Sequence, residues 1–251
     1  MVHFVGAGPG AEDLITLRGK QYLEQADVII YAGSLVNPAL LKWAKEGCAI
    51  YNSATMTLEE VLHVMEDGER KGFTTVRLHT GDPAIYGAIK EQMDGLAERG
   101  IDYDICPGVS SLFGAAASLQ IEYTLPRVSQ SVIITRAEGR TPVPEGESLK
   151  ELASHGATMV LFLSSALAKK VQEDLTAGGY GPDTPVAVVY KATWPDERIL
   201  RTTLGELPEA MRQADIQKTA LIVVGKVLSG DYEKSKLYDP AFTTEYRKGK
   251  D

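Results

Sequence analysis

The chain of 251 residues is 44% hydrophobic and 24% charged, values typical of a globular protein large enough to bury a full core. Its 34 acidic residues outnumber 26 basic ones, and the net charge of −8 argues against general nucleic-acid binding, which depends on phosphate neutralisation. No apolar run approaches the ~20 residues needed to span a bilayer, so we expect no membrane partner.

The two cysteines, Cys48 and Cys106, are too few for a disulfide framework, and the 4 histidines show no zinc-site spacing. We therefore expect no metal site. The N-terminal residues lack the cationic flank, the long apolar stretch and the cleavage site of a signal peptide. A reducing, cytoplasmic location fits these features best.

In chain order, the first half alternates short apolar runs with helical periods. We predict strands at residues 3–6, 28–31, 49–52, 75–79 and 103–106, and helices at residues 16–26, 38–44, 58–71, 85–99 and 110–119. The strand segments are continuous apolar runs, which is typical of strands buried on both faces of a parallel sheet. Thr57 and Glu60 form a capping-box pattern at the start of the helix at 58–71.

The second half follows residues 121–130, which contain Pro126 and no periodicity and are therefore predicted to be a linker. We predict strands at 131–135, 158–163, 186–190, 198–203 and 220–225, and helices at 148–154, 166–177 and 207–214. The predicted fold class is α/β, with two α/β domains. Residues 1–120 form a domain with a mainly parallel sheet. Residues 131–230 form a domain with a mixed sheet, in which 198–203 pairs antiparallel, and residues 231–251 form a polar tail.

The first predicted strand ends in a glycine loop, residues 6–11 (GAGPGA), which matches the loose dinucleotide-binding pattern. Three features argue against a dinucleotide. The next helix is predicted about five residues later, Glu12 and Asp13 would repel a pyrophosphate, and residues 31–33 (YAG) offer no carboxylate to a ribose. Carboxylates beside a glycine loop favour a cationic ligand, and a plain tight turn is the other interpretation.

Two more glycine loops follow predicted strands, at residues 80–87 (TGDPAIYG) and 106–111 (CPGVSS). Asp82 either caps the following helix or accepts hydrogen bonds from a ribose or an ammonium group. Ligands of open α/β sheets bind beyond the carboxyl ends of the strands. We therefore expect the three loops to lie together at one edge of the sheet and to form a ligand site.

Together the segments GAGPG, TGDPAIYGA and PGVSS resemble the tetrapyrrole (corrin and sirohaem) methyltransferases, over about residues 2–227. Longer matches at 31–36 (YAGSLV), 135–144 (TRAEGRTPVP) and 189–197 (VYKATWPDE) resemble the branch that methylates C-11 of precorrin-4 or cobalt-precorrin-4. The resemblance implies a cobalamin-biosynthesis enzyme that uses S-adenosylmethionine and releases S-adenosylhomocysteine. It also implies a cofactor cleft between two α/β domains and a homodimer.

The resemblance further implies a set of cofactor contacts, carried over where the motifs match. These are Pro9, Thr80, Gly81, Asp82, Ile85, Ser110, Ser111, Leu163, Ala192, Thr219 and Ala220. Relatives often have Met at the position of Leu163 and Gly at that of Ala192, and they have a Thr-Ala pair in place of Ser110 and Ser111. The acid and lysine that uroporphyrinogen methyltransferases carry after the second and third strands are missing here, where residues 32–34 are AGS and 52–54 are NSA.

The implied substrate is a polycarboxylate macrocycle, which an acidic protein must hold through local cations. The substrate-binding candidates are Ser34, Arg136, Arg140, Lys191 and Trp194, with a solvated charge or a core tryptophan as the alternative interpretation. Glu138, Tyr86 and His79 are open candidates for proton transfer, and the loop at 137–147 is a candidate lid. Alternative functions are methylation of a tetrapyrrole at another position, a dinucleotide-binding oxidoreductase, and a non-catalytic tetrapyrrole carrier.

Overall fold

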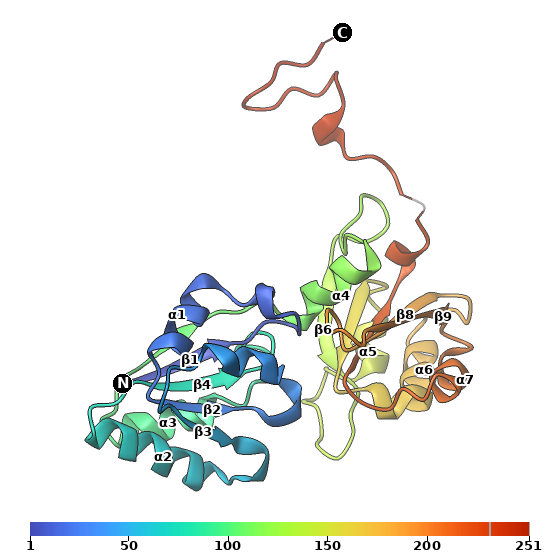
Figure 1. The fold of residues 1–251 in the computed structure, drawn as a ribbon. Coiled ribbons are helices and arrows are strands. Elements are labelled where there is room, and N and C mark those ends of the chain that lie inside the picture. The colour runs from blue at the N-terminus through green and yellow to red at the C-terminus, as the bar shows by residue number, and fades with distance from the viewer. Residues whose placement is uncertain (231, 251) are drawn as a thin grey trace. The chain divides into compact units, whose positions relative to one another are not determined.

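The structure is a computed structural model that describes residues 1–230 and 232–250. The chain divides into two compact units, and Figure 1 labels their helices and strands. Unit 1 contains Met1–Ala115 together with Lys191–Glu197, and unit 2 contains the rest of the described chain. The expected tail at 231–251 includes Asp231 and Asp251, which lie outside the described residues. In the described part, no helix has the length and apolar character needed to cross a membrane.

Unit 1 is built on a five-stranded sheet in the order β3-β2-β4-β1-β5, and all neighbouring strands pair parallel. The strands are β1 (Val2–Gly6), β2 (Val28–Tyr31), β3 (Ala49–Asn52), β4 (Thr75–His79) and β5 (Tyr103–Cys106). This confirms the parallel sheet predicted from the continuous apolar runs. Because β4, β1 and β5 are adjacent, the loops that follow them leave the same edge of the sheet side by side.

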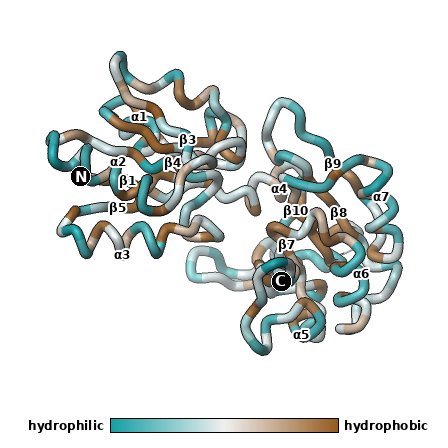
Figure 2. The backbone as a smooth tube through the Cα atoms, turned by 90° about the horizontal axis from the view of Figure 1, so that it is seen from below, coloured by the Kyte–Doolittle hydropathy of each residue, from teal (hydrophilic) through white to brown (hydrophobic). Residues whose placement is uncertain are grey.

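Helices cover both faces of this sheet. They are α1 (Leu17–Gln25), α2 (Leu58–Arg70) and α3 (Lys90–Glu98), with a 3₁₀ helix at Pro38–Trp43, whereas α4 (Ser111–Leu119) begins in unit 1 and ends in unit 2. Phe4 and Ile30 pack with Leu62 and Leu96 of α2 and α3 in one core cluster. A second cluster on alternate strand positions includes Ile29 and Leu78, together with Leu23 of α1. Figure 2 shows hydrophobic residues concentrated along the strands.

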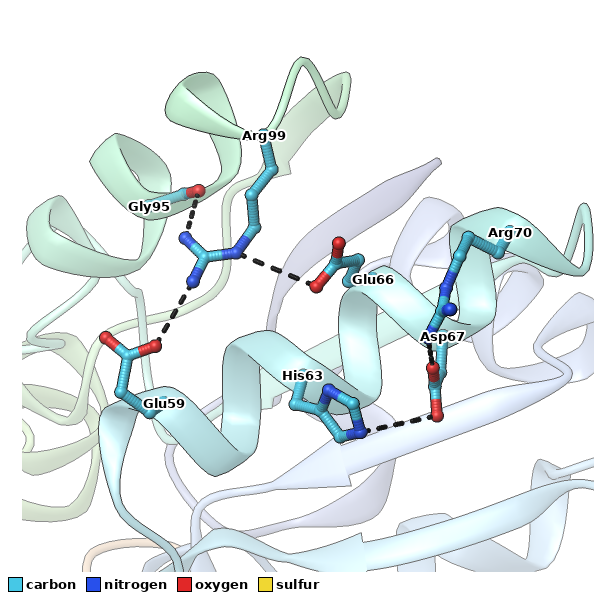
Figure 3. Close-up of polar contacts among 7 residues, drawn as sticks. All are labelled: Glu59, His63, Glu66, Asp67, Arg70, Gly95 and Arg99. Atoms are coloured by element: carbon cyan, nitrogen blue, oxygen red, sulfur yellow. Dashed lines mark hydrogen bonds and ion pairs between the residues drawn. The ribbon is translucent and has the colours of Figure 1, made fainter.

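Polar contacts hold α2 and α3 together on their outer surface (Figure 3). The Arg99 guanidinium donates to the Gly95 carbonyl at 2.8 Å and to Glu59 at 3.1 Å, and its Nε lies 3.9 Å from Glu66. α2 begins with the capping box predicted from the sequence: Thr57 Oγ1 accepts from the Glu60 N–H, and Glu60 accepts from the Thr57 N–H at 2.7 Å. These contacts hold together two helices that pack on the same face of the sheet.

Unit 2 contains a mixed five-stranded sheet in the order β6-β7-β10-β8-β9. The strands are β6 (Val132–Arg136), β7 (Thr158–Phe162), β8 (Pro185–Tyr190), β9 (Arg198–Thr203) and β10 (Ala220–Val224). Only β6 and β7 pair parallel, and β9 pairs antiparallel with β8, as predicted. The sheet packs with α5 (Leu149–Ala153), α6 (Ala168–Ala177) and α7 (Leu207–Gln213) around Met159, Leu161 and Ile222.

Two helix predictions in unit 1 are wrong in part. The helix predicted at 85–99 begins only at Lys90, because Tyr86 and Ala88 have positive φ angles of 54° and 49°, which end any right-handed helix. The helix predicted at 38–44 is a 3₁₀ helix over Pro38–Trp43, which Asn37 caps by accepting from the Ala39 N–H.

Candidate functional site

The three glycine loops predicted to meet at one sheet edge do meet in unit 1. The loops after β1 and β4 form a small antiparallel bridge in which the Gly8 N–H donates to the Gly81 carbonyl at 3.2 Å and the Gly81 N–H donates to the Gly8 carbonyl at 2.8 Å. The Ala7 N–H donates to the His79 carbonyl at 2.7 Å. The two loops therefore form one continuous backbone surface at the carboxyl edge of the sheet.

The side chain of Asp82 connects this surface to the third loop. One carboxylate oxygen accepts from the Gly108 N–H, and the other accepts from the Ala84 N–H, both at 2.8 Å. Asp82 does not cap α3, which starts eight positions later at Lys90. Each carboxylate oxygen keeps a second lone pair, so Asp82 can still accept a hydrogen bond from a ligand.

Close approach of the loops explains their glycines. A Cβ on Gly108 would lie 2.2 Å from the Gly81 carbonyl oxygen, and a Cβ on Gly6 would lie 2.6 Å from the Gly108 Cα. Gly8 and Gly81 also have positive φ angles of 80° and 60°. Backbone packing this close leaves no room for side chains, so peptide groups make up much of the surface at this edge.

Hydroxyl groups border the same surface. Thr80 is half-buried at the end of β4, and Ser110 is buried with its Oγ accepting from the Leu112 N–H at 3.3 Å. Ser111 is half-buried at the start of α4. Ile85 is half-buried in the segment after Asp82. The structure thus places the predicted unit 1 residues of the cofactor set on or next to the joined loops.

The segment after Asp82 is held in a strained conformation. Tyr86 and Ala88 lie in the left-handed region, and a Cβ on Gly87, between them, would lie 2.1 Å from the Pro83 carbonyl oxygen. Such conformations cost about 1–3 kcal/mol each and concentrate at ligand-binding segments. The side chain of Tyr86, a proton-transfer candidate, is 46% exposed.

His79, another proton-transfer candidate, is buried at the end of β4, and its Nε2 has no hydrogen-bond partner. Burial, with the nearby charge of Arg77, lowers the pKa of His79 to about 3. A group with so low a pKa is a weak base at neutral pH. Arg77 is buried as well, and its guanidinium donates to Gln92 at 2.9 Å and to the Ile30 carbonyl at 3.1 Å. Arg77 could not be singled out from the sequence, because a cation in an apolar strand carries no motif.

The segment Lys191–Glu197 joins β8 to β9 and packs within unit 1. The Trp194 indole N–H donates to the Pro9 carbonyl at 3.0 Å, and Thr193 Oγ1 accepts from the Ala11 N–H at 2.9 Å. Ala192 is buried, and Lys191 donates to Asp196 at 2.6 Å. The structure therefore brings Pro9, Ala192, Lys191 and Trp194 together in unit 1, whereas the sequence predicts Pro9 in the first domain and the other three in the second.

The remaining cofactor candidates gather at one end of the unit 2 sheet. Leu163 follows β7 and Thr219 precedes β10, and these two strands pair antiparallel with Leu161 opposite Ile222. Leu163 and Thr219 have positive φ angles of 51° and 56°, and Leu163 is 68% exposed. The Ala220 carbonyl accepts from Ser165 Oγ at 2.9 Å. Strained backbone positions of this kind cluster at functional sites.

Arg136, at the end of β6, holds the loop that follows it. Its guanidinium donates to the carbonyls of Ala137, Thr141 and Pro142 at 3.3, 3.2 and 2.7 Å. Glu138 and Arg140 are exposed within this loop. Ser34, the unit 1 substrate candidate, is exposed in a 3₁₀ turn after β2. Among the described residues no group of three or more His, Cys, Asp or Glu side chains is arranged to hold a metal ion.

Comparison with known proteins gives matches over most of the chain. The family model of the tetrapyrrole (corrin/porphyrin) methylases matches residues 1–208. The chain is 58% identical to a cobalt-precorrin-4 C(11)-methyltransferase of Methanocaldococcus jannaschii, over 98% of this chain and 96% of that protein.

Solved structures with the same fold include an enzyme of cobalamin biosynthesis. The X-ray structure of this cobalt precorrin-4 methyltransferase has a TM-score of 0.89 and 53% identity, covering 90% of this chain and 95% of that one. A uroporphyrin-III C-methyltransferase of Thermus thermophilus, solved with S-adenosylhomocysteine, has a TM-score of 0.77 and 26% identity, covering 91% and 98% of the two chains.

Proposed function

Since this chain belongs to the tetrapyrrole (corrin/porphyrin) methylases, we propose that it transfers a methyl group from S-adenosylmethionine to C-11 of precorrin-4 or cobalt-precorrin-4 in cobalamin biosynthesis. The observation that carries the proposal within the structure is the junction of the three glycine loops through Gly8, Gly81 and the Asp82–Gly108 hydrogen bond. This junction presents peptide groups, hydroxyls and one carboxylate at the carboxyl edge of a parallel sheet, where such sheets bind ligands.

The residues present fit S-adenosylmethionine. The cofactor supplies a reactive methyl group on a positively charged sulfur. Asp82 offers carboxylate oxygens to a ribose or an ammonium group, and the crowded glycines let the backbone approach closely. The buried hydroxyl of Ser110 and those of Thr80 and Ser111 add hydrogen-bonding groups that carry no charge. A site of neutral dipoles with a single carboxylate suits a cationic ligand better than a pyrophosphate.

For the methyl transfer itself, we propose that this chain acts mainly by orientation. Holding two reactants in line can supply roughly 7–11 kcal/mol of the barrier in favourable cases. Pro9, Thr80, Gly81, Asp82, Ile85, Ser110, Ser111 and Ala192 are the proposed cofactor contacts in unit 1, and Leu163, Thr219 and Ala220 are those in unit 2. The strained backbone at Leu163 and Thr219 supports the assignment of the unit 2 contacts.

For the macrocycle, we propose Ser34, Arg136, Arg140 and Lys191 as contacts, because a polycarboxylate needs cations and hydroxyls. Lys191 is paired with Asp196 and Arg136 with loop carbonyls, so both are held in defined positions. We also propose that the protein works as a homodimer in the cytoplasm, which analytical ultracentrifugation and cell fractionation test.

The function is tested by two measurements. Titration calorimetry should show binding of S-adenosylhomocysteine and no binding of NAD or NADP. Incubation with the precursor and cofactor labelled with ¹³C in the methyl group, followed by NMR, should place the new methyl at C-11. A label at another ring carbon would redirect the proposal to a different tetrapyrrole position, and binding of NAD alone would replace it with the oxidoreductase.

A further inference from the structure

The tip of the β8–β9 connection makes a specific contact with the first glycine loop. The Trp194 indole N–H donates to the Pro9 carbonyl at 3.0 Å, and Thr193 Oγ1 accepts from the Ala11 N–H at 2.9 Å. These two hydrogen bonds lie on either side of Gly10. They satisfy backbone groups of a loop that is also bridged at Gly8 to the Gly81 loop.

Gly10 is also packed tightly against neighbouring side chains. A Cβ on Gly10 would lie 2.0 Å from Trp194 Cδ1 and 2.4 Å from Nε1, so only glycine fits against the indole. Asn37 Nδ2, at the start of the 3₁₀ helix Pro38–Trp43, donates to the Gly10 carbonyl at 2.8 Å. A Cβ on Gly114 of α4 would lie 2.8 Å from the Pro9 Cβ and 3.3 Å from the Thr193 Cγ2. Three segments therefore fix Pro9 and Gly10.

The tip is itself held rigidly. Lys191 and Thr193 have positive φ angles of 48° and 68°, which costs energy for residues with side chains. The cost is offset by local bonds: the Trp194 N–H donates to the Lys191 carbonyl at 3.0 Å, and the Thr193 N–H donates to the Glu197 carboxylate at 2.5 Å. The Lys191 ammonium lies 5.2 Å from the centre of the Trp194 ring, within the range of a cation–π interaction.

We propose that Thr193 and Trp194 are positioning residues, which hold the Pro9–Ala11 backbone in the conformation that the cofactor requires. This inference rests on the proposed function. It assigns to Trp194 a role different from the macrocycle contact expected from the sequence, because the polar end of the indole is engaged by the Pro9 carbonyl. A loop that is already held in the binding conformation loses less entropy when the ligand binds. Removing these hydrogen bonds should therefore weaken cofactor affinity.

The test uses conservative variants and S-adenosylhomocysteine titration of the full chain. Trp194→Phe keeps an aromatic ring, smaller than the indole, and removes the N–H, and Thr193→Val keeps the shape and removes the acceptor. Each should raise the Kd of S-adenosylhomocysteine roughly 2- to 13-fold, the range for one hydrogen bond. The KM for S-adenosylmethionine should rise in parallel, whereas kcat at saturating cofactor should stay within about twofold. Thr193→Ser keeps the hydroxyl and should restore the wild-type Kd.

A second test uses the contact at Gly10. Gly10→Ala should weaken binding roughly 5- to 150-fold in the wild-type background, because its Cβ collides with the indole. In a Trp194→Ala background the same change has room, and its additional effect should fall below about twofold. Such non-additivity reports direct coupling between the two positions and does not require that either single variant retain full stability.

The matched control is Trp43, the other of the 2 tryptophans, which packs beneath Lys20 and Lys42. Trp43→Phe should leave the Kd unchanged. In this variant Trp194 is the one remaining tryptophan, and its fluorescence should change when S-adenosylhomocysteine binds. If the wild type binds but Trp194→Phe and Thr193→Val bind equally well, or if they lower only kcat and thermal stability, the positioning role is refuted. Failure of the wild type to bind would instead refute the proposed function, and this inference with it.

Discussion

The carboxylate of Asp82 accepts a hydrogen bond from the backbone N–H of Gly108 at 2.8 Å, across 26 positions of sequence. Through this bond, the residue that follows β4 fixes the loop that follows β5. Its other oxygen accepts from the Ala84 N–H and shapes the start of its own loop. One side chain thus determines the relative position of two of the three loops that form the proposed cofactor site.

Replacing Asp82 by asparagine should therefore affect both binding and stability. The amide has one acceptor oxygen instead of two and carries no charge, so one of the two backbone N–H groups loses its partner. A charged-group hydrogen bond contributes about 1.5–3 kcal/mol, so we expect at least a tenfold rise in the Kd of S-adenosylhomocysteine. Calorimetry measures the Kd and thermal unfolding the stability. The control is Asp67→Asn, on the exposed face of α2 (Figure 3), where neither quantity should change appreciably.

Gly108→Ala should disrupt the junction sterically. The new methyl group would lie 2.2 Å from the Gly81 carbonyl oxygen and 2.7 Å from the Gly6 Cα, both backbone atoms that cannot rotate away. We expect destabilisation of about 1–3 kcal/mol in urea unfolding and loss of measurable cofactor binding. Gly181→Ala is the matched control, because nothing lies within 4 Å of its Cβ position. Equal behaviour of the two variants would show that the loops are not packed as described.

The glycine loops could be predicted from the sequence because the pattern is local: a short apolar strand followed by Gly and Pro marks both the strand end and the turn. The convergence of the loops followed from the parallel sheet. The start of α3 could not be predicted, since residues 85–89 contain no proline that would exclude a helix, and a single glycine is tolerated inside one. Only the tertiary setting places Tyr86 and Ala88 in the left-handed region and delays the helix to Lys90.

The partner of Trp194 was equally beyond prediction. The indole N–H and the Pro9 carbonyl are 185 positions apart, and no periodicity or motif links them. The sequence distinguished residues 189–197 by resemblance alone, and that resemblance suggested an apolar wall for the substrate. Similarly, the sequence marked Arg136 as a cation for the macrocycle but gave no sign that three loop carbonyls already accept from its guanidinium.

His79 should make the protein less stable as pH falls below 6.5. Above pH 6.5 the imidazole is neutral in both native and unfolded chains and contributes nothing. Between pH 6.5 and about 3, the unfolded chain binds a proton that the buried native imidazole, with its pKa lowered to about 3, does not. The unfolding free energy should therefore fall by about 1.4 kcal/mol per pH unit in this range.

A variant isolates this contribution. His79→Gln removes the titrating group, so its urea-unfolding free energy should fall less steeply than that of the wild type between pH 6.5 and 4.5. Carboxylates with a lowered pKa, such as Asp27 beside Lys45 and the Thr74 N–H, also stabilise the fold less as the pH falls. Their contribution to the unfolding free energy is the same in both proteins and cancels in the comparison. Parallel pH profiles for the two proteins would mean that His79 becomes protonated in the native state.

Arg136 and Arg140 should differ in how they affect substrate binding. Arg140 is exposed, so Arg140→Ala should raise the KM for the tetrapyrrole about tenfold by removing a carboxylate partner, with stability unchanged. Arg136 also holds the carbonyls of Ala137, Thr141 and Pro142. Arg136→Ala should therefore raise the same KM and, in addition, make the loop at 137–147 more sensitive to limited proteolysis.

Neither arginine variant should change the Kd of S-adenosylhomocysteine by more than about twofold, because neither arginine is among the proposed cofactor contacts. Arg136→Lys separates substrate binding from loop holding. A lysine ammonium keeps the charge, but it cannot reach several carbonyls as the planar guanidinium does. It should retain more substrate affinity than Arg136→Ala while remaining sensitive to protease. Arg212→Ala, which removes an exposed pair with Glu209, serves as the control. If Arg140→Ala leaves the KM unchanged while Arg136→Ala raises it, the loop contributes by its conformation and Arg140 is not a substrate contact.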